Sequence, residues 1–428
     1  MDSTTVTHVV TGAGIGVLTQ LDRFMPPGSV LVLEEPEVCA ARDIAGRLSQ
    51  VACAAGLVEA PVQDTANAGR LAEFVERPEG VRAVLPGLEY GVVAAAALAE
   101  AWGLPSAGTA AARLFRDKAL LRESVRRLGL AQPDWQRVQS AQEVAAFRDT
   151  HGGECVLKPT HLQASVGVQL LGPHDDLEEA WKHTETADEA LLRTARDGVP
   201  GYLVEERLHG LEFSIEAIVQ NGAVIYRNTT ETQLYPGRHP VELGHIVPAT
   251  IPASAPEVVA AMDKVVEATG FRNGVLHAEW ILRDGTPHLL ECAARIPGGY
   301  ITLLIGLACE VDLLRGMVDV LGGAEPVVNP GPPPRGAAVR FLDPVAVPGR
   351  VREVRGLEEA QATPGVIGVW MAVEPGGLQS AEVTSSWSRP GEVVATGDDR
   401  DQAMATAMAA AAAIEIVTDT DTDTDTED

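Results

Sequence analysis

The chain has 428 residues, enough for about two to four domains, and 46% of them are hydrophobic while only 4% are aromatic. Its formal net charge of −27 argues against nucleic acid as a partner, because phosphate-backbone binding needs a basic surface. Any anionic ligand must therefore be held by a local group of Lys and Arg side chains.

The cysteines and the absence of targeting segments predict a cytoplasmic protein. The five cysteines are scattered, odd in number and form no CxxC pair, as is typical of free thiols in a reducing compartment. The N-terminus has no basic-then-apolar signal, and the chain has no apolar run long enough to span a membrane. We therefore expect no membrane partner. The cysteines are Cys39, Cys53, Cys155, Cys292 and Cys309.

Residues 6–115 alternate between apolar and Ala-rich segments, which predicts strands and helices of an α/β domain. Such alternation implies a parallel sheet with ligand-facing loops at the carboxyl ends of its strands. The predicted strands are Val6–Val10, Val30–Leu33 and Val81–Leu85, and the predicted helices are Val38–Ala55 and Tyr90–Trp102.

A glycine loop follows the first predicted strand and has two interpretations. Gly12 and Gly14 begin a GxGxxG pattern, and Glu34 lies at about the right distance for a ribose contact in a dinucleotide site. However, Val17 occupies the place of the third glycine. A structural strand–helix turn or a substrate-facing loop is therefore favoured over NAD binding.

Two lysines lie at positions from which they could bind the phosphate groups of a ligand. Lys118 follows Asp117 at the start of a predicted basic helix, Arg116–Leu130, and is either a solvated residue beside a helix cap or a phosphate ligand. Lys158 ends the short strand Cys155–Pro159 and precedes a loop of Ser, Thr and Gly. An ammonium group beside small residues, whose backbone N–H groups can approach closely, suits phosphate binding.

The middle of the chain has acidic strands and one polar stretch. After one or two helices over residues 175–196, Gly201–Leu208 reads as a strand, and Leu211–Val219 alternates as the next, with Glu212, Ser214 and Glu216 on one face that a solvent surface would also explain. The segment Tyr226–Thr250 contains Glu242 and His245 and shows no helical period. Long irregular segments in compact domains are usually functional or disordered. This one is rich in His, Arg and aromatic residues, so we predict a substrate loop there.

The stretch Leu276–Gly299 is predicted to form a β-hairpin that ends in a Gly-rich turn. Its arms are Leu276–Leu282 and His288–Arg295, and Asp-Gly supplies the positive φ of the turn. A three-residue loop would place Glu279 opposite Glu291 and His277 opposite Ala293, with Arg295 on the same face.

Two carboxylates directly opposite each other would repel at about 5 Å unless a cation lies between them. Mg²⁺ suits one or two carboxylates and leaves its other positions to water and phosphate. The hairpin therefore predicts a nucleotide–Mg²⁺ site, with Arg295 beside it for an anionic group. The alternative is that Glu279 and Glu291 lie on a solvent face.

The C-terminal part is predicted to be β-rich. Helices are expected over Pro256–Gly270 and Tyr300–Leu321, and short strands with Gly/Pro turns over Gly336–Gly397. We also expect a Pro-rich linker (Val327–Arg335), an Ala-rich helix (Asp398–Val417) and a disordered acidic tail over residues 418–428.

The order and spacing of six motifs resemble the ATP-grasp superfamily. The resemblance is greatest to the carboxylate–amine ligases, including bacterial L-amino-acid ligases, and more distant to biotin carboxylase. It runs from about residue 6 to residue 417. It rests on Asp117-Lys118, the VLKP strand at Lys158, Ser165-Val166-Gly167, Val204–Leu208, GLEFSIE at Gly210–Glu216, and HAEW at His277–Trp280 with LLECAARIPGG at Leu289–Gly299.

The resemblance implies an ATP-grasp fold, an α/β class with several domains. The implied domains are an N-terminal Rossmann-like parallel-sheet domain over 1–114, an ATP-grasp domain over 115–326 with a mobile lid over about 150–207, the linker over 327–335, and a C-terminal β-rich domain with a terminal helix over 336–417. A homodimer is compatible with the β-rich end.

The resemblance also implies a role for each candidate residue. Lys118 and Lys158 would contact ATP phosphates, Ser165 and Gly167 would belong to the closing loop, and Glu205, Glu206, Leu208 and Glu212 would lie around adenine and ribose. Glu279 and Glu291 would bind Mg²⁺ or Mn²⁺. Arg295 and Lys158 would act in catalysis, and Glu242, His245, Arg295, Gly298 and Gly299 would contact substrate. The family usually has Asn where this chain has Ala293, which removes one metal ligand.

The expected reaction is ATP-dependent amide formation between a small carboxylic acid and an amine, most simply two amino acids. The acid would become an acyl phosphate, and ADP and phosphate would be released. Three alternatives stay open: an ATP-grasp carboxylase that activates bicarbonate, a nucleotide-binding protein without turnover, and an NAD-linked enzyme that uses the N-terminal glycine loop.

Overall fold

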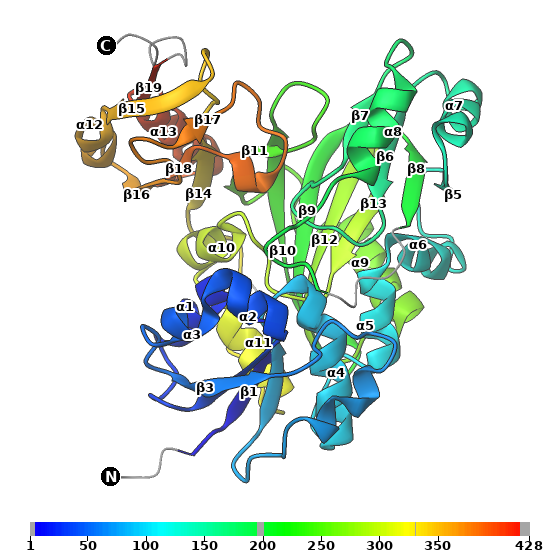
Figure 1. Cartoon of the computed structure of the whole chain (residues 1–428), viewed down its shortest axis with the longest axis vertical. Helices are drawn as coiled ribbons and strands as arrows, with labels where there is room; N and C mark the ends of the chain where they lie inside the picture. Colours follow the sequence, from blue (N-terminus) through cyan, green and yellow to red (C-terminus); the bar gives the residue numbers. More distant parts are fainter. Residues whose placement is uncertain (1–4, 195–200, 330, 420–428) are drawn as a thin grey trace, which may run out of the picture.

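The computed structural model describes residues 5–194, 201–329 and 331–419. Figure 1 shows an N-terminal α/β region, a central antiparallel sheet that continues into the C-terminal part, and a smaller sheet beside it. This arrangement confirms the expected α/β class with a parallel N-terminal sheet and a β-rich C-terminal part.

The N-terminal sheet is parallel and has the strand order β3-β2-β1-β4. Its apolar strands are largely buried, as expected when helices cover both faces. The strands are β1 (His8–Thr11), β2 (Val30–Glu34), β3 (Ala54–Glu59) and β4 (Ala83–Pro86); the helices are α1 (Ile15–Leu21), α2 (Pro36–Arg42), α3 (Ile44–Leu48) and α4 (Val92–Ala101), with 3-10 turns η1 (Ala68–Glu73) and η2 (Glu89–Gly91).

The single helix predicted over Val38–Ala55 is wrong. The chain forms α2 and α3, which Asp43 separates in a left-handed conformation (φ 46°), and β3 already begins at Ala54. The Ala-rich composition favours helix, but pairing of β3 with β2 supplies backbone hydrogen bonds that override this propensity.

Glu34 supports the structural interpretation of the glycine loop. Its buried carboxylate accepts hydrogen bonds from the backbone N–H of Ala13 (2.7 Å) and the hydroxyl of Tyr90 (2.6 Å). Gly12 has a φ of 80°, which favours glycine at this position. The carboxylate thus holds the turn between β1 and α1 and is not presented to a ribose.

The predicted helix Arg116–Leu130 is interrupted at its start. Helix α5 (Thr109–Arg116) ends there, and α6 (Lys118–Arg126) begins after Asp117, whose side chain accepts hydrogen bonds from the backbone N–H groups of residues 119 and 120. Asp117 is therefore the expected N-cap. Lys118, however, is only 7% exposed and is not solvated.

The smaller sheet carries the Lys158 strand and has the order β5-β8-β6-β7, with antiparallel neighbours. Two helices cover it, and their apolar side chains share a core with the strands. The elements are β5 (Trp135–Val138), α7 (Ala141–Thr150), β6 (Cys155–Pro159), β7 (Gln169–Leu171), α8 (Leu177–Glu185) and β8 (Tyr202–Glu206). Part of the stretch predicted as one or two helices, residues 195–196, lies outside the described residues.

The central sheet has eight strands in the order β13-β12-β9-β10-β11-β14-β18-β16. C-terminal strands thus extend the sheet that carries the acidic hairpin. Its strands are β9 (Leu211–Gln220), β10 (Ala223–Leu234), β11 (Glu242–Val247), β12 (Gly274–Arg283), β13 (Thr286–Ala293), β14 (Gly336–Phe341), β16 (Val366–Met371) and β18 (Gly391–Gly397); the neighbouring helices are α9 (Pro256–Thr269), α10 (Ile301–Cys309) and α11 (Leu313–Leu321).

The irregular loop predicted over Tyr226–Thr250 is wrong. Most of it forms β10 and β11, which pair with each other from Glu231 opposite Ile246. Asn228, Thr229 and Thr230 of β10 are consecutive polar residues that are all buried, so the segment lacks the alternation of apolar and polar residues by which a half-buried strand is recognised.

The hairpin places Glu279 opposite Glu291 as predicted, although its loop is shorter than predicted and one strand has a bulge. The loop has two residues, Asp284 and Gly285, both with positive φ, and not three. A β-bulge then makes Leu290 an extra residue, because Trp280 faces Leu289 while Glu279 faces Glu291. The bulge restores the register that the shorter loop would have shifted.

The C-terminal part adds a second small sheet in the order β17-β15-β19. The predicted helix Asp398–Val417 is too long, since α13 ends at Ala412 and residues 415–419 form β19, which pairs with β15. Residues 418 and 419 of the acidic tail are therefore in a strand, and residues 420–428 lie outside the described part. The elements are β15 (Gly349–Arg355), α12 (Leu357–Ala362), β17 (Leu378–Gln379), η3 (Ser386–Ser388), α13 (Arg400–Ala412) and β19 (Glu415–Asp419).

One apolar core joins the N-terminal region to the central sheet. It includes Leu18 of α1, Leu304 of α10, Leu314 of α11, Ile218 of β9 and Val339 of β14. In the described ranges, no helix is long and apolar enough to cross a membrane. All five cysteines are free, as predicted.

Arg122 of α6 is almost fully buried where three elements meet. Its Nε donates to Glu205 of β8 (2.7 Å), and its Nη1 and Nη2 donate to the carbonyl oxygens of Leu289 (2.5 Å) and Leu290 (2.8 Å) at the bulge of β13. A single guanidinium therefore satisfies an acid and two backbone carbonyls in the interior.

We expect Arg122→Met to lower the free energy of unfolding by about 3–5 kcal/mol, because it leaves the buried Glu205 with one cation fewer and two carbonyls without donors. Chemical denaturation followed by circular dichroism measures this. Arg126→Met, on the exposed side of the same helix, is the control and should leave the denaturation midpoint almost unchanged. Equal midpoints for both variants would contradict the assignment.

Candidate active site

Strands β12 and β13 present the two opposed carboxylates at the open side of the central sheet. The side chains of Glu279 and Glu291 are 39% and 33% exposed. Lys118 at the start of α6 contacts Glu291 (2.9 Å) and also donates to the carbonyl oxygen of Leu162 (2.8 Å). Lys118 therefore lies at the acidic hairpin and not on a solvent face.

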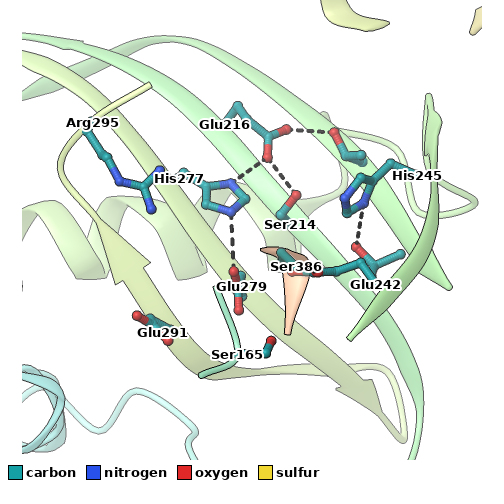
Figure 2. Close-up of polar contacts among 12 residues, drawn as sticks. Ser165, Ser214, Glu216, Glu242, His245, His277, Glu279, Glu291, Arg295 and Ser386 are labelled. Atoms are coloured by element: carbon teal, nitrogen blue, oxygen red, sulfur yellow. Dashed lines mark hydrogen bonds and ion pairs between the residues drawn. The ribbon is translucent and has the colours of Figure 1, made fainter. Parts of the chain in front are cut away.

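A buried polar chain lies behind Glu279 (Figure 2). His277 contacts Glu216 through Nδ1 (2.9 Å) and Glu279 through Nε2 (3.3 Å). Glu216 also accepts hydrogen bonds from Ser214 (2.5 Å) and Thr230 (2.7 Å). Ser214 and Glu216 are buried, so the solvent-surface explanation of this acidic face is wrong for them.

Burial and hydrogen bonding oppose each other in this chain. Burial raises the pKa of Glu216, but the hydrogen bonds from His277 and Ser214 outweigh it and hold that pKa below its ordinary value. Burial lowers the pKa of His277, yet its two carboxylate partners raise it to about 9. His277 is therefore a cation at neutral pH, and it orients Glu279 from behind.

Lys158 is paired inside the protein. Its ammonium lies 2.6 Å from Glu205, which also binds Arg122, and both Lys158 and Glu205 are nearly inaccessible to solvent. Burial raises the pKa of Glu205, but Arg122 and Lys158 outweigh it and keep the carboxylate ionised. The predicted ribose role of Glu205 stays a prediction, since its oxygens are engaged by two cations.

The remaining candidates of the nucleotide pocket lie nearby. Glu206 pairs with Arg283 (2.9 Å), and Leu208 is buried. Glu212 is half-buried, and burial together with Glu279 and Glu242 raises its pKa to about 8. The carboxylates of Glu212 on β9, Glu242 on β11 and Glu279 on β12 thus interact through their like charges.

The loop after Lys158 contains successive left-handed residues. Ala164 and Ser165 have φ values of 57° and 59°, and Gly167 has 73°. The Ser165 hydroxyl donates to the carbonyl oxygen of Pro240 (2.9 Å), while the carbonyl of Ala164 accepts from the backbone N–H of Ser386 (3.1 Å). The loop thus touches both the segment before β11 and the C-terminal part.

Arg295 is part of an ion-pair cluster with a residue that sequence reasoning missed. Its Nε donates to Glu89 (2.6 Å), and Arg116 pairs with the same carboxylate (3.2 Å). Burial raises the pKa of Glu89, but the two arginines outweigh it and hold that pKa low. Glu89 follows β4 at the carboxyl edge of the parallel sheet, where ligand-facing loops were expected.

Glu242 and His245 both lie on β11, where the pairing with β10 shifts register between Glu242 and Gly244. His245 is 4% exposed, hydrogen-bonds Thr232 (3.3 Å) and lies against Gly299, where an added Cβ would be 2.7 Å from its Nε2. Gly298 has open space around its Cα. Glu242 is held by Ser386 and Arg389 of the C-terminal part, neither of which has a local sequence signal.

The carboxylate pair suits Mg²⁺ by its chemistry. Glu279 and Glu291 are partly exposed oxygen ligands in register, and Mg²⁺ takes its other ligands from water and phosphate. Within the described ranges, no group of three or more His, Cys, Asp or Glu side chains is arranged to hold a metal. Ala293 adds no oxygen, so the protein would supply two carboxylates.

Two family models match this chain. Residues 152–303 match the ATP-grasp domain, and residues 342–419 match the L-amino acid ligase C-terminal domain 2.

Two curated relatives illustrate the similarity in sequence. The chain is 26% identical over 262 residues to an alanine–anticapsin ligase of Bacillus subtilis (strain 168), with 56% of this chain and 54% of that protein covered. It is 28% identical over 349 residues to dapdiamide A synthase of Enterobacter agglomerans, with coverage of 75% and 76%. The match thus spans about half the length of the alanine–anticapsin ligase.

Solved structures show the same fold. An L-amino acid ligase from Bacillus licheniformis aligns with a TM-score of 0.75 at 20% identity, covering 97% of this chain and 100% of that chain. A phosphoribosylglycinamide synthetase from Anaerococcus prevotii aligns with a TM-score of 0.68 at 15% identity and the same coverage, 97% and 100%. These likenesses confirm the fold.

The burial of His245 generates a pH-dependence of stability. Burial lowers its pKa from 6.5 to about 4; Glu242 opposes this shift, and Arg389 adds to it. Between these values the unfolded chain binds a proton that the folded protein does not, so stability falls as the pH drops from 6.5 towards 4. We expect His245→Gln to reduce this acid-induced loss of folding free energy by at most about 3 kcal/mol. Denaturation curves at pH 7 and pH 4.5 measure it, and an identical pH-dependence in both proteins would contradict it.

Proposed function

From the ATP-grasp domain that this chain contains at residues 152–303, we propose that the protein is an ADP-forming carboxylate–amine ligase that joins two amino acids. The observation that carries the proposal is the register of Glu279 and Glu291, opposite each other and beside Lys118. The match of residues 342–419 to an L-amino acid ligase domain, and the named activities of the relatives, favour amino-acid substrates.

Nucleotide binding would exchange internal ion pairs for pairs with the ligand. Lys118 and Lys158 now contact Glu291 and Glu205 at 2.9 and 2.6 Å, so both lysines are already held near the acidic hairpin. ATP phosphates would take these ammonium groups. Glu279 and Glu291 would hold Mg²⁺, which when bound neutralises phosphate charge.

In the first chemical step a carboxylate oxygen of the substrate would bond to the γ-phosphorus of ATP, and ADP would leave with the electrons of the broken P–O bond. Its transition state spreads negative charge over phosphate oxygens, so fixed cations lower its energy. Lys158 would stabilise the negative charge of the phosphoryl group. Arg295, after breaking its ion pair with Glu89, would stabilise the carboxylate that becomes an acyl phosphate. Closure of the loop at Ser165 and Gly167 would keep water from the acyl phosphate.

The second step would be attack of an amine on the acyl carbon. The ammonium group loses one proton before its lone pair forms the C–N bond, and phosphate leaves with the electrons of the C–O bond; the nitrogen then loses a second proton. The carboxylate of Glu242 is the candidate acceptor for the first proton. The pKa of about 4 makes His245 a weak base, so it would hydrogen-bond substrate as a neutral ring.

The test is phosphate release from ATP–Mg²⁺ across pairs of amino acids, with mass detection of products. Phosphate that appears only with particular pairs, with the condensed mass and without AMP, would support the proposal. We expect Glu291→Ala to lower turnover by about a hundredfold or more, because one of the two carboxylate ligands is lost. Glu267→Gln, exposed on α9 of the same domain, should keep full activity.

Other outcomes point to other functions. Phosphate released only with bicarbonate would move the protein to the carboxylases. Saturable ATP binding without turnover under any condition would indicate a nucleotide-binding protein. Unchanged turnover in Glu291→Ala would refute the assignment of the metal site.

A further inference from the structure

A segment between β17 and β18 supplies an arginine to the substrate side of the site. Arg389 pairs through Nη2 with Glu242 of β11 and donates to the Ser386 hydroxyl (2.9 Å), which in turn donates to the same carboxylate oxygen (3.0 Å). The Arg389 side chain is 8% exposed and that of Glu242 is 24% exposed. This pair joins residues 147 positions apart in the sequence.

The guanidinium group of Arg389 is only partly used by the protein. Both of these contacts are made by Nη2, whereas Nε is buried and has no hydrogen-bond partner within the described residues. The guanidinium group lies over the Phe341 ring, with Cζ of Arg389 3.8 Å from the ring centroid, and this contact restricts the orientation of the guanidinium plane. Arginine commonly binds a carboxylate through two nitrogens, so a one-nitrogen contact with Glu242 leaves binding capacity for a second anion.

The pair faces the reacting region. Figure 2 shows Ser386 and Glu242 next to His245, on the side of Glu279 and Ser165. The backbone N–H of Ser386 donates to Ala164 of the loop that follows Lys158. Arg389 is thus connected to the loop expected to cover ATP, and it lies beside the strand that carries the substrate candidates.

If both substrates are amino acids, amide formation leaves two substrate charges: the ammonium group of the first substrate and the carboxylate of the second. The carboxylate of the first substrate is consumed as acyl phosphate, where Lys158 and Arg295 act. The ammonium group of the second substrate becomes the nucleophile after it loses a proton, and its own carboxylate survives the reaction. That carboxylate needs a cation which the phosphate chemistry does not use.

We propose that Arg389 binds the carboxylate of the amine-donating substrate, and that Glu242 receives its ammonium group. The proposal rests on the function proposed above and makes the second substrate an α-amino acid and not a simple amine. In an α-amino acid the ammonium group and the carboxylate are attached to the same carbon atom, so the two charges lie close together. The Arg389–Glu242 pair offers the complementary charges in direct contact. Exchange of this internal ion pair for two pairs with the zwitterion keeps every charge compensated.

The first measurement is ligand binding, which needs no turnover. Melting temperatures are recorded with the common L-amino acids and with their carboxamides, which keep the amine and lose the negative charge. We expect amino acids to stabilise the wild-type protein more than their carboxamides do. In Arg389→Met this preference should disappear, while Arg352→Met, an exposed arginine on β15, should behave as wild type.

The second measurement is the split between KM and kcat with an active pair of amino acids. We expect Arg389→Met to raise KM for the amine-donating amino acid by about 10- to 100-fold, with KM for ATP unchanged. Arg389→Lys should recover part of the loss. Ser386→Ala, which loosens the same contact without removing charge, should keep the preference for amino acids over carboxamides.

A purely structural role for Arg389 predicts other results. If Arg389→Met weakens amino acids and carboxamides equally, or if the wild-type protein binds both equally well, the proposal is overturned. If the binding preference follows Arg389 but no amino-acid pair yields phosphate, the amino-acid site stands and the ligase function fails.

Discussion

The contacts of Arg122 are the constraint on which the candidate site depends. This one side chain binds Glu205, which holds Lys158, and it caps the carbonyls of Leu289 and Leu290 at the bulge that sets the register of the acidic hairpin. The position of the candidate phosphate-binding lysine and the alignment of the two candidate metal-binding carboxylates are thus linked through one buried guanidinium. Because an unpaired charge in this interior is costly, the three elements are held in a single arrangement before any ligand arrives.

The charged groups of the candidate site compensate one another in pairs. Lys118 pairs with Glu291, Lys158 with Glu205, Arg295 with Glu89, and Arg389 with Glu242. Each pair joins a cation that would meet substrate to an acid on another element, so ligand binding becomes an exchange of partners between groups that are already placed. Although the chain has a net charge of −27, the candidate site therefore has local positive charge, which is buried among acids.

Local patterns in the sequence predicted much of the site and less of its supports. Glu279 opposite Glu291 was predicted correctly although the loop was assigned three residues, because the bulge at Leu290 compensates for the shorter turn. The irregular loop over Tyr226–Thr250 was wrong, since strands buried on both faces do not alternate in polarity. Glu89, Ser386 and Arg389 were missed because each contacts Arg295 or Glu242 from a position between 144 and 206 residues away, and only tertiary packing brings these residues together.

The strand order of the central sheet has a consequence for how this protein can be divided. Strand β11, which carries Glu242 and His245, hydrogen-bonds on its far side to β14, from beyond the Pro-rich segment. A fragment that ended at that segment would expose the unpaired backbone groups of β11 as a free sheet edge, open to pairing with other chains. The two regions matched by separate family models therefore share one sheet, and substitutions in β14 of the C-terminal part would act directly on the strand that carries Glu242 and His245.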